Sequence, residues 1–287
     1  MILKTENITK KFDSKTVLEN VSLTFEQGHS YALLGRNGMG KSTLINVIMQ
    51  RTAFKGKITI DGVNIKDNDM LMQSLFCMND NSFYPPWMKL RTVFELTDAL
   101  YLDFDMDYAK NLAEDFDIDL KKRINQLSTG QRTLYKVILG LSSNAPFVFL
   151  DEPVLGIDVN MRDTVYRILT HKMAEERSCF VICTHLIEEI ENLIENVVIL
   201  HDQHIIANMT AEQMYERYRA FSGKAEDVNI YASELNVIGM EKMAGFRKIV
   251  IDTAGRDFTA PAELTEDHAG IQEIFYHLTG GAPEVRA

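Results

Sequence analysis

The chain has 287 residues, of which 46% are hydrophobic, enough for one large domain or two modest ones with buried cores. Its 30 Lys and Arg against 41 Asp and Glu give a formal net charge of -11, which argues against a surface built to neutralise nucleic-acid phosphates. The first residues lack the apolar core of a signal peptide and no uncharged apolar run reaches the roughly 18 residues that span a bilayer, so we expect a cytoplasmic chain that meets a membrane only through a partner.

The N-terminal segment predicts a small antiparallel sheet. Its first 26 residues hold short apolar stretches separated by the turn-prone "KFDSKT", a pattern typical of β-strands. Further along, "KGKITIDGVNI" predicts a β-hairpin with Asp61 and Gly62 at its turn. Both patterns therefore belong to one antiparallel layer.

Apolar, β-rich runs then predict buried parallel strands: "YALLG" from Tyr31, "SLFCM" from Ser74, "FVFLD" from Phe147 and "CFVICTH" from Cys179. Because helical patterns lie between these runs, the core is expected to be an α/β sheet with crossover helices. Cys179 and Cys183 would lie on one strand, roughly 13 Å apart at about 3.3 Å per residue, which is too far for a disulfide. The cysteines therefore indicate a reducing compartment.

Two further regions complete the chain. The connection between the second and third core strands is too long for a simple crossover and carries several helical patterns, so we predict an inserted helical subdomain at about residues 85–143. "NVVILHDQHIIAN" predicts a closing hairpin. Residues 210–287 change character, with a charged helix in "AEQMYERYRA", a strand in "RKIVIDTAG" and a last helix in "IQEIFYHLTGG" that two glycines end.

The acidic segment "DFDMDYAKNLAE" has two interpretations. Oxygen-bearing side chains fall at the ligand positions of an EF-hand calcium loop: Asp103, Asp105, Asp107, Asn111 and Glu114. That loop needs glycine at its sixth position, where this chain has Tyr108. We therefore prefer an acidic first turn of a helix that carries Tyr108, Leu112 and Phe116 on one face.

The segment "GRNGMGKST", residues 35–43, follows a predicted strand and precedes the helical pattern "TLINVIM". This context predicts a P-loop, in which glycines let backbone N–H groups wrap phosphates, Lys41 brings positive charge to the β- and γ-phosphates, and the Ser42 hydroxyl binds Mg²⁺. The alternative is a glycine-rich turn with a chance Lys-Ser pair, which the complete motif in this context disfavours.

Polar side chains also end two other core strands. In "FVFLDEP", Asp151 is placed to hold the Mg²⁺ shell and Glu152 to orient or deprotonate an attacking water. In "CFVICTH", His185 is placed to donate to a phosphate oxygen. An acidic turn and a structural histidine are the alternatives. Because parallel strands end at one edge of the sheet, we favour a shared site with the P-loop.

Residues 125–140, "NQLSTGQRTLYKVILG", combine a helix with a second predicted anion site. Apolar residues recur at helical spacing, on one face: Leu134, Val137, Ile138 and Leu141. The preceding "STGQ", residues 128–131, lies where the helix begins and offers backbone N–H groups and a hydroxyl at the positive end of the helix dipole.

The order of "GRNGMGKST", "LSTGQ", "FVFLDEP", "GID" and "CTH" resembles the nucleotide-binding subunit of an ATP-binding cassette (ABC) transporter over residues 2–209. "LSTGQ" is the specific part, because most other P-loop families lack it. The resemblance implies a P-loop NTPase with a RecA-like α/β core, an antiparallel β subdomain and an inserted α-helical subdomain. Residues 1–209 would be the ATPase domain and residues 210–287 a small α+β C-terminal accessory domain.

The resemblance further implies that ATP and Mg²⁺ bind between two subunits stacked head to tail, each ATP lying between one P-loop and the other subunit's signature segment, "LSTGQ". The nucleotide contacts carried over by position are Phe12, Asn37, Gly38, Gly40, Lys41, Ser42, Thr43, Asn79, Ser128, Gly130, Gln131 and Asp158. Among these, the signature residues would contact the γ-phosphate, Asp158 would be the dimer contact of the D-loop "GID", and Phe12 would stack on adenine in place of the family's usual Tyr. The Mg²⁺ ligands carried over are Ser42, Asp151 and Asn79.

The chain departs from the family pattern at a few positions. The usual Gln after the second core strand falls on Asn79, which keeps the amide but is one methylene shorter and so reaches less far toward a metal ion or a membrane partner. Thr129 replaces a commoner Gly, and "GIDV" lacks the usual proline. Since the catalytic candidates Glu152, His185 and Lys41 are all present, we expect hydrolysis of ATP rather than binding alone.

The expected function is the energy-coupling ATPase of an exporter whose spanning permease subunits are separate chains. The segments around "LSTGQR", "THLIEEIENLIENVVIL" and "IFYHLTGG" resemble bacterial exporters that serve antimicrobial or amphipathic peptides and phenol-soluble modulins. ATP would close the dimer, which would be a homodimer or a pair with a paralogue, and closure would pull on the membrane partner through residues 79–87. The aromatic residues Phe83, Tyr84 and Trp87 would dock a coupling helix there or form a buried cluster.

The alternative is a soluble ABC-type ATPase that acts on nucleic acid or the ribosome. The acidic charge, the single P-loop and the lack of a long coiled-coil insertion disfavour it. The C-terminal region is expected to regulate the enzyme or stabilise the dimer.

Overall fold

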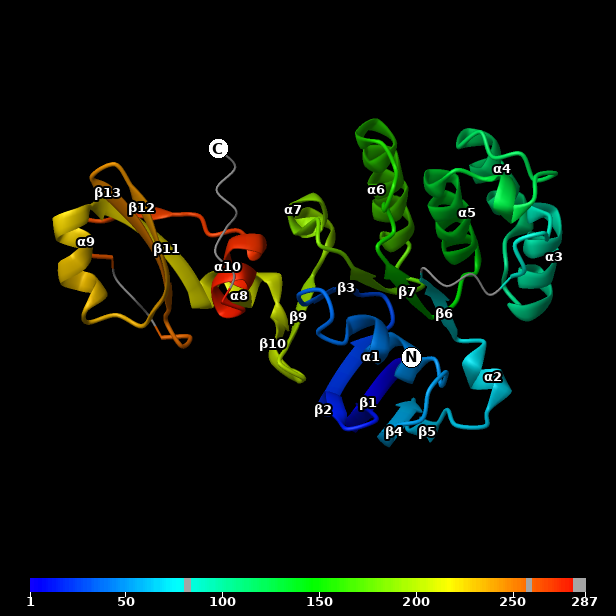
Figure 1. The fold of residues 1–287 in the computed structure, drawn as a ribbon, viewed down its shortest axis with the longest axis horizontal. Coiled ribbons are helices and arrows are strands. Elements are labelled where there is room, and N and C mark those ends of the chain that lie inside the picture. The colour runs from blue at the N-terminus through cyan, green and yellow to red at the C-terminus, as the bar shows by residue number, and fades with distance from the viewer. Residues whose placement is uncertain (80–83, 257–259, 281–287) are drawn as a thin grey trace. The chain divides into compact units, whose positions relative to one another are not determined.

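The computed structural model describes residues 1–79, 84–256 and 260–280 (Figure 1). The chain divides into two compact units, one made of Met1–His185 with Leu200–Ile206 and the other of Leu186–Ile199 with the residues from Ala207 onward. Residues 186–199 thus belong with the C-terminal part although they precede the expected boundary at residue 209. That boundary stays a prediction.

An antiparallel sheet begins the chain. Its strands lie in the order β2-β1-β4-β5, with bounds β1 Ile2–Phe12, β2 Lys15–Glu26, β4 Lys55–Ile60 and β5 Val63–Asn64. Asp61 and Gly62 connect β4 to β5 with φ angles of 48° and 82°, as in the type I′ turn that a two-residue hairpin favours. The predicted hairpin and antiparallel layer are confirmed.

A second sheet forms the core of the fold. Its strands lie in the order β10-β9-β3-β8-β7-β6, with bounds β3 Ser30–Leu34, β6 Leu75–Met78, β7 Phe147–Asp151, β8 Cys179–Cys183, β9 Asn196–His201 and β10 His204–Thr210. Strand β8 pairs in parallel with β3 and with β7, and β7 pairs in parallel with β6. These strands are buried almost throughout, which explains why the sequence shows unbroken apolar runs there. The predicted parallel core is confirmed.

Helices connect the core strands. The bounds are α1 Lys41–Ile48, α2 Asp69–Met72, α6 Val159–Met173, α7 Ile187–Ile190 and η2 Glu191–Leu193. Between β6 and β7 lie α3 Leu90–Leu100, α4 Met106–Asp115, η1 Ile124–Gln126 and α5 Thr129–Ser142, the inserted helices that the sequence predicts. Within residues 1–79, 84–256 and 260–280, no helix is both long enough and apolar enough to cross a bilayer.

The acidic segment "DFDMDYAKNLAE", residues 103–114, contains the N-cap and nearly all of helix α4. The Asp105 carboxylate accepts the backbone N–H of Tyr108 at 2.9 Å and caps the helix, which satisfies one of its unpaired donors. Leu112 and Phe116 are buried, whereas Tyr108 is half-buried. The helical interpretation is confirmed.

The C-terminal region contains a third sheet with the strand order β12-β13-β11-β14. Its elements are α8 Ala211–Arg217, β11 Tyr218–Lys224, α9 Ala225–Ala232, β12 Val237–Met243, β13 Phe246–Asp252, β14 Thr265–Asp267 and α10 Ile271–Leu278. One face carries α9 over a small core of Phe221, Val228, Ile249, Ile251 and Leu264. The predicted α+β character of this region is confirmed.

The helix predicted for "AEQMYERYRA" is too long. Helix α8 ends at Arg217, and β11 begins at Tyr218. Tyr218, Ala220 and Phe221 are buried in the sheet, where β11 pairs with both β13 and β14. Pairing on both sides outweighs the helical propensity of this short segment.

Candidate active site

The P-loop joins β3 to α1. Gly38 and Gly40 have φ angles of 80° and 105°, a left-handed backbone that glycine adopts without strain. A Cβ at Gly40 would lie 3.1 Å from Val17 Cγ1 and would crowd the turn. Helix α1 begins with no acidic residue and no side-chain cap. Its first N–H groups are therefore open to an anion at the positive end of the helix dipole.

The side chains of two P-loop residues, Lys41 and Ser42, form hydrogen bonds with other parts of the site. Lys41 donates a hydrogen bond to the carbonyl oxygen of Gly35, so its ammonium is folded back over the loop. Ser42 donates from Oγ to Oδ2 of Asp151 at 2.8 Å. Asp151 ends β7, so the fold brings together two of the oxygen groups predicted to hold Mg²⁺. A hydroxyl next to a carboxylate fits the oxygen donors that Mg²⁺ prefers.

Asn79, the third predicted metal ligand, directly follows β6. Its side chain is buried and its Oδ1 atom has no hydrogen-bond partner among the described residues. The backbone carbonyl of Asn79 accepts a hydrogen bond from Lys136 Nζ at 2.7 Å, which ties the end of β6 to helix α5. The orphaned amide oxygen thus lies at a fixed position at the end of a core strand.

Glu152 and His185 form a pair at the ends of β7 and β8. The Nδ1 atom of His185 lies 3.0 Å from both carboxylate oxygens of Glu152. Thr184 Oγ1 also donates to Glu152 Oε2 at 3.1 Å. With Nδ1 turned to the carboxylate, Nε2 of His185 remains to meet a ligand. The side chain of His185 is 60% exposed, so this nitrogen is accessible.

The backbone of Glu152 is itself unusual. Its φ angle is 51°, a left-handed conformation that costs a non-glycine residue roughly 1–2 kcal/mol. The Glu152 N–H donates to the carbonyl of Cys183 at 2.8 Å, which fixes the turn against β8. Strain of this kind clusters at functional sites because the surrounding structure must hold it.

The signature segment begins α5 with a reciprocal cap. Ser128 Oγ accepts the backbone N–H of Gln131 at 3.1 Å, and Gln131 Oε1 accepts that of Ser128 at 3.2 Å. Each side chain thus accepts a hydrogen bond from the backbone of the other residue. Asp158 plays a similar role at α6, where its carboxylate accepts the N–H of Met161 at 3.1 Å. The predicted anion site at Ser128 therefore also serves as a helix cap.

Gly130 and Gly156 bring the signature segment against the loop that precedes α6. A Cβ at Gly130 would lie 2.8 Å from the carbonyl oxygen of Gly156, and a Cβ at Gly156 would lie 2.8 Å from Thr129 Cγ2. The sequence analysis names neither this close approach nor the contact of Thr184 with Glu152. The signal that could have pointed to Thr184 is its hydroxyl next to the histidine in "CTH".

Phe12, the predicted adenine contact, ends strand β1. The residue is 48% exposed, and Lys10 Nζ lies 4.3 Å from the ring centroid. An exposed ring at the end of a rigid strand offers a flat surface on which a base can stack.

A cavity of about 340 Å³ lies where β6, α3 and α5 meet. Burial raises the pKa of the thiol of Cys77 and of the phenol of Tyr101, so both stay neutral at pH 7. Tyr84 is half-buried and hydrogen-bonded to Thr97, whereas Trp87 is 65% exposed. Of the three aromatic residues for which docking or a buried cluster was left open, Trp87 is exposed, Tyr84 is half-buried, and Phe83 lies outside the described residues.

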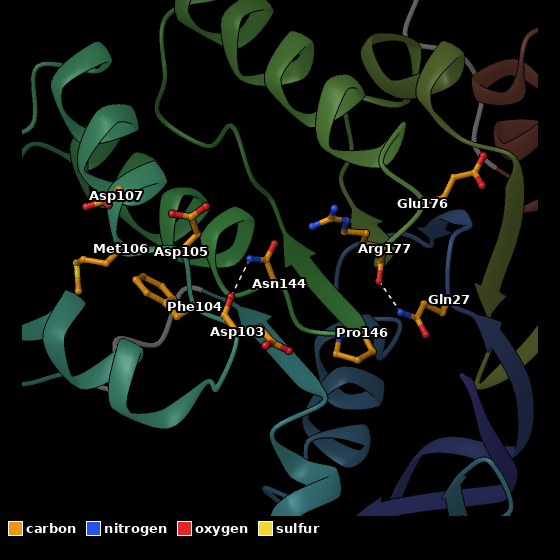
Figure 2. Close-up of a pocket in the computed structure, with 10 residues that line it drawn as sticks. All are labelled: Gln27, Asp103, Phe104, Asp105, Met106, Asp107, Asn144, Pro146, Glu176 and Arg177. Atoms are coloured by element: carbon orange, nitrogen blue, oxygen red, sulfur yellow. Dashed lines mark hydrogen bonds between the residues drawn. The ribbon is translucent and has the colours of Figure 1, made fainter.

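A larger cavity of about 890 Å³ lies at the opposite edge of the core sheet (Figure 2). Pro146 and Arg177 precede β7 and β8, so this is the edge where the strands begin. Gln27 Nε2 donates to the carbonyl of Arg177 at 2.6 Å, and Asn144 Nδ2 to that of Asp103 at 2.8 Å. None of the residues predicted to contact ATP or Mg²⁺ is among the residues that line this cavity.

Comparisons with known proteins give the family. The family model described as ABC transporter matches residues 18–155. The chain is 30% identical to the putative ABC transporter ATP-binding protein AlbC of Bacillus subtilis, over 66% of this chain and 83% of AlbC. It is 29% identical to the ABC transporter ATP-binding protein YtrB of the same organism, over 98% of this chain and 99% of YtrB. A more distant relative is the ribose import ATP-binding protein RbsA of Oceanobacillus iheyensis, with 27% identity over 74% of this chain and 48% of RbsA.

Solved structures share the fold. A dimeric structure of a post-hydrolysis state of an ATP-binding cassette bound to ADP and Pi superposes with a TM-score of 0.64 at 21% identity, over 73% of this chain and 98% of that one. The P-loop NTPase fold is thus confirmed. With the family match and the relatives, it identifies the chain as a member of the ATP-binding subunits of ABC transporters, ATPases that couple hydrolysis to transport.

Proposed function

We propose that the chain is the ATP-hydrolysing subunit of a bacterial exporter and works as a head-to-tail dimer on separate transmembrane permease subunits. Family membership already makes it an ATPase coupled to transport. The proposal adds the residues, the assembly and the direction. The observation that carries it is the Ser42–Asp151 contact beside the Glu152–His185 pair, both at the ends of parallel strands.

The proposed chemistry divides the roles among these residues. Lys41 and the first N–H groups of α1 bind the phosphates. Ser42, Asp151 and the unpartnered amide oxygen of Asn79 are the candidate oxygen ligands of Mg²⁺, which neutralises phosphate charge when bound. Glu152 orients the attacking water or accepts its proton, and the backbone turn and Thr184 hold its carboxylate in place. His185 in its doubly protonated form donates from Nε2 to a γ-phosphate oxygen, since its Nδ1–H faces the Glu152 carboxylate.

The proposed dimer rests on the predicted anion site of the signature segment. Ser128 is exposed at the start of α5 and bonds only within its own cap. The cap uses the N–H groups of Ser128 and Gln131, and the rest of this helix terminus is an anion site that a γ-phosphate bound to another copy's P-loop would fill. Gly130 and Gln131 would join that contact. The exposed Asp158 would lie at the interface, and Phe12 would stack on the adenine of its own subunit's ATP.

The proposed permease contact is the surface around Asn79, Tyr84 and Trp87. The neighbouring cavity between α3 and α5 is lined mainly by apolar and neutral groups, and the exposed Trp87 ring adds apolar area at the surface. Such a surface suits a short amphipathic helix of a membrane subunit. Because Lys136 ties Asn79 to α5, movement of such a helix would be transmitted to the end of β6.

Direction and cargo are tested in membranes. The chain should be co-expressed with its neighbouring membrane subunits and purified as a complex, then studied in inside-out vesicles. Mg²⁺-ATP added outside should drive an amphipathic cationic peptide into the lumen. Peptide leaving preloaded vesicles instead would show import and contradict the exporter assignment. Copurification of nucleic acid in a nuclease-sensitive complex, in place of membrane subunits, would favour the soluble alternative.

A further inference from the structure

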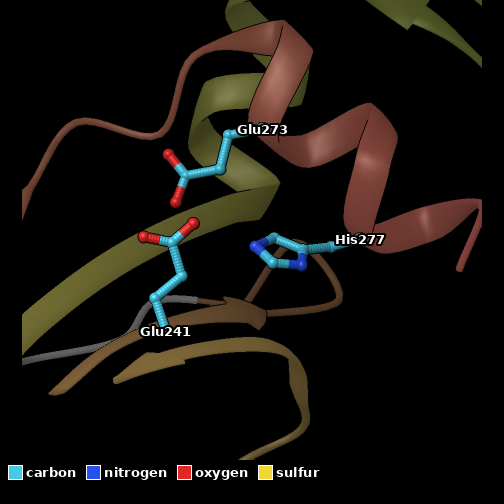
Figure 3. Close-up of side chains that lie close together, drawn as sticks. All are labelled: Glu241, Glu273 and His277. Atoms are coloured by element: carbon cyan, nitrogen blue, oxygen red, sulfur yellow. The ribbon is translucent and has the colours of Figure 1, made fainter. Parts of the chain in front are cut away.

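Three metal-binding side chains converge in the C-terminal unit, far along the chain from the ATPase motifs. Glu241 projects from β12, and Glu273 and His277 project from α10 toward it (Figure 3). One ligand atom from each residue lies within 4.8 Å of the others. Glu273 and His277 are four positions apart, so they share one face of the helix. The arrangement thus joins the last helix to the edge strand of the third sheet.

Two polar atoms in this cluster lack partners. Glu273 Oε1 and His277 Nε2 are buried and have no hydrogen-bond partner in the described part of the chain. Buried polar side-chain atoms are almost always hydrogen-bonded or bound to an ion. A ligand that accepts electron pairs from both a carboxylate and an imidazole would satisfy them, and a metal cation is such a ligand.

Strand β12 is shaped to accept the histidine ring. A Cβ at Gly239 would lie 2.2 Å from Cγ of His277, so any other residue would displace the imidazole. Gly239 is two residues before Glu241 and therefore faces the same side of the sheet. The ring is positioned by packing against bare backbone, which reduces the rotamer freedom that metal binding would otherwise have to remove.

Lys248 leaves one oxygen of Glu273 available. Its Nζ binds Glu273 Oε2 at 2.7 Å, and its residue is the cross-strand partner of Glu241. Lys248 and Glu273 line a cavity of about 190 Å³ together with Glu188 and Glu241. The cavity lining thus holds one ammonium group and three carboxylates. The formal charge is therefore negative, and a carboxylate fixed through one oxygen can coordinate a metal through the other.

We propose that Glu241, Glu273 and His277 form a binding site for a divalent transition-metal ion, with Zn²⁺ as the representative ion. Imidazole together with carboxylates suits Zn²⁺, Co²⁺ and Ni²⁺ better than Mg²⁺ or Ca²⁺, which prefer all-oxygen shells. Protein ligands supply three positions and water supplies the fourth. The bound ion links α10 to β12 and so stabilises the C-terminal unit, independently of the ATP site.

The test uses the full-length protein after removal of metal with a chelator. Titration with Zn²⁺ should show saturable binding of one ion per chain and raise the thermal midpoint, and Co²⁺ should give visible d–d absorption. Mg²⁺ at the same concentration should do neither. Absence of saturable Zn²⁺ binding overturns the proposal.

Variants separate this site from other histidines. Glu241→Gln and His277→Ala should each lower Zn²⁺ affinity by at least about tenfold, since even outer-shell changes cost 10–100-fold. Glu241→Gln preserves shape, so it remains informative if His277→Ala fails to fold. The control His204→Ala removes a half-exposed imidazole on β10 and should bind Zn²⁺ with the same affinity as the parent protein. Unchanged affinity in both cluster variants would refute the site.

Lys248→Gln provides the opposite change. Removing the ammonium should lower the thermal midpoint of the metal-free protein, because three carboxylates lose their counter-charge. It should also increase the affinity for Zn²⁺. Added Zn²⁺ should therefore restore the thermal midpoint of this variant. If Zn²⁺ gives no recovery, the cluster is an ordinary ion network and the proposal fails.

Discussion

Glu152 is the residue whose exchange most directly tests the proposed chemistry. Glu152→Gln keeps size and polarity but cannot accept a proton, so ATP turnover should fall by about 100-fold or more, while ATP binding persists. Phosphate release and equilibrium binding of a fluorescent ATP analogue measure the two effects. Glu176→Gln, an exposed glutamate, is the matched control. Turnover equal in the two variants would remove Glu152 from the mechanism.

Thr184 is expected to position Glu152 rather than to react. Thr184→Val keeps the shape of the side chain and removes the hydroxyl that donates to Glu152 Oε2. Because a single hydrogen bond contributes about 0.5–1.5 kcal/mol, kcat should fall by about 2- to 10-fold with KM for ATP almost unchanged. Steady-state kinetics distinguish these parameters. In a Glu152→Gln background the substitution should have no further effect on kcat, and additive losses would argue against a positioning role.

Sequence motifs name candidate residues where the chemistry allows few side-chain types at a fixed place. Lys41, Asp151 and His185 are such candidates, because phosphate and metal chemistry restrict the side chains that can serve. The contact of Ser42 with Asp151 is expected once β3, which leads into the P-loop, and β7 end at the same edge of the core sheet. The reciprocal cap of Ser128 and Gln131 and the burial of Asn79 depend on local backbone geometry and packing, which a motif does not contain.

At the scale of elements, the parallel core was predictable because strands buried on both faces are continuously apolar. The C-terminal sheet was harder to predict. Its strand β11 is mixed in polarity, with Arg219 and Ser222 among buried neighbours. Polar and apolar residues therefore do not alternate regularly, and the sequence looks like a continuation of the charged helix α8. The pairing of β11 with β13 and β14 involves residues far apart in sequence, and no local pattern reports such pairing.

An ion pair that joins two elements of this sheet gives a pH-dependent prediction. Arg217, at the end of α8, binds Asp252, at the end of β13, through two hydrogen bonds of 2.8 and 2.9 Å. These bonds lower the pKa of Asp252 below its usual value of about 3.9. A lowered folded-state pKa means that the pair stabilises the fold above that value and that the stabilisation is lost as the pH falls through the folded-state pKa.

Asp252→Asn should therefore lower the free energy of unfolding at pH 7 by about 1 kcal/mol or less, the range for partly exposed pairs. The difference from the parent should be smaller at about pH 3, below the usual pKa of an aspartate, than at pH 7. Urea unfolding followed by circular dichroism at both pH values measures it. Glu216→Gln changes an exposed neighbouring carboxylate and should leave stability nearly unchanged at both. A deficit that is the same at both pH values would exclude the ion pair as its cause.

At the scale of the whole molecule, the proposed dimer would make the active site a property of two chains, with Ser128 of one chain at the ATP of the other. Ser128→Arg adds bulk and charge to the exposed start of α5, so ATP-driven dimers and turnover should both be lost, while ATP binding through the P-loop persists. Light scattering in the Glu152→Gln background, where ATP is not hydrolysed, measures the dimer. Because Ser128 also caps α5, Ser128→Ala is the control: it loses about 1 kcal/mol of helix stability but leaves the interface open. A Ser128→Arg monomer that hydrolyses ATP at the parental rate would show that each chain holds a complete site by itself.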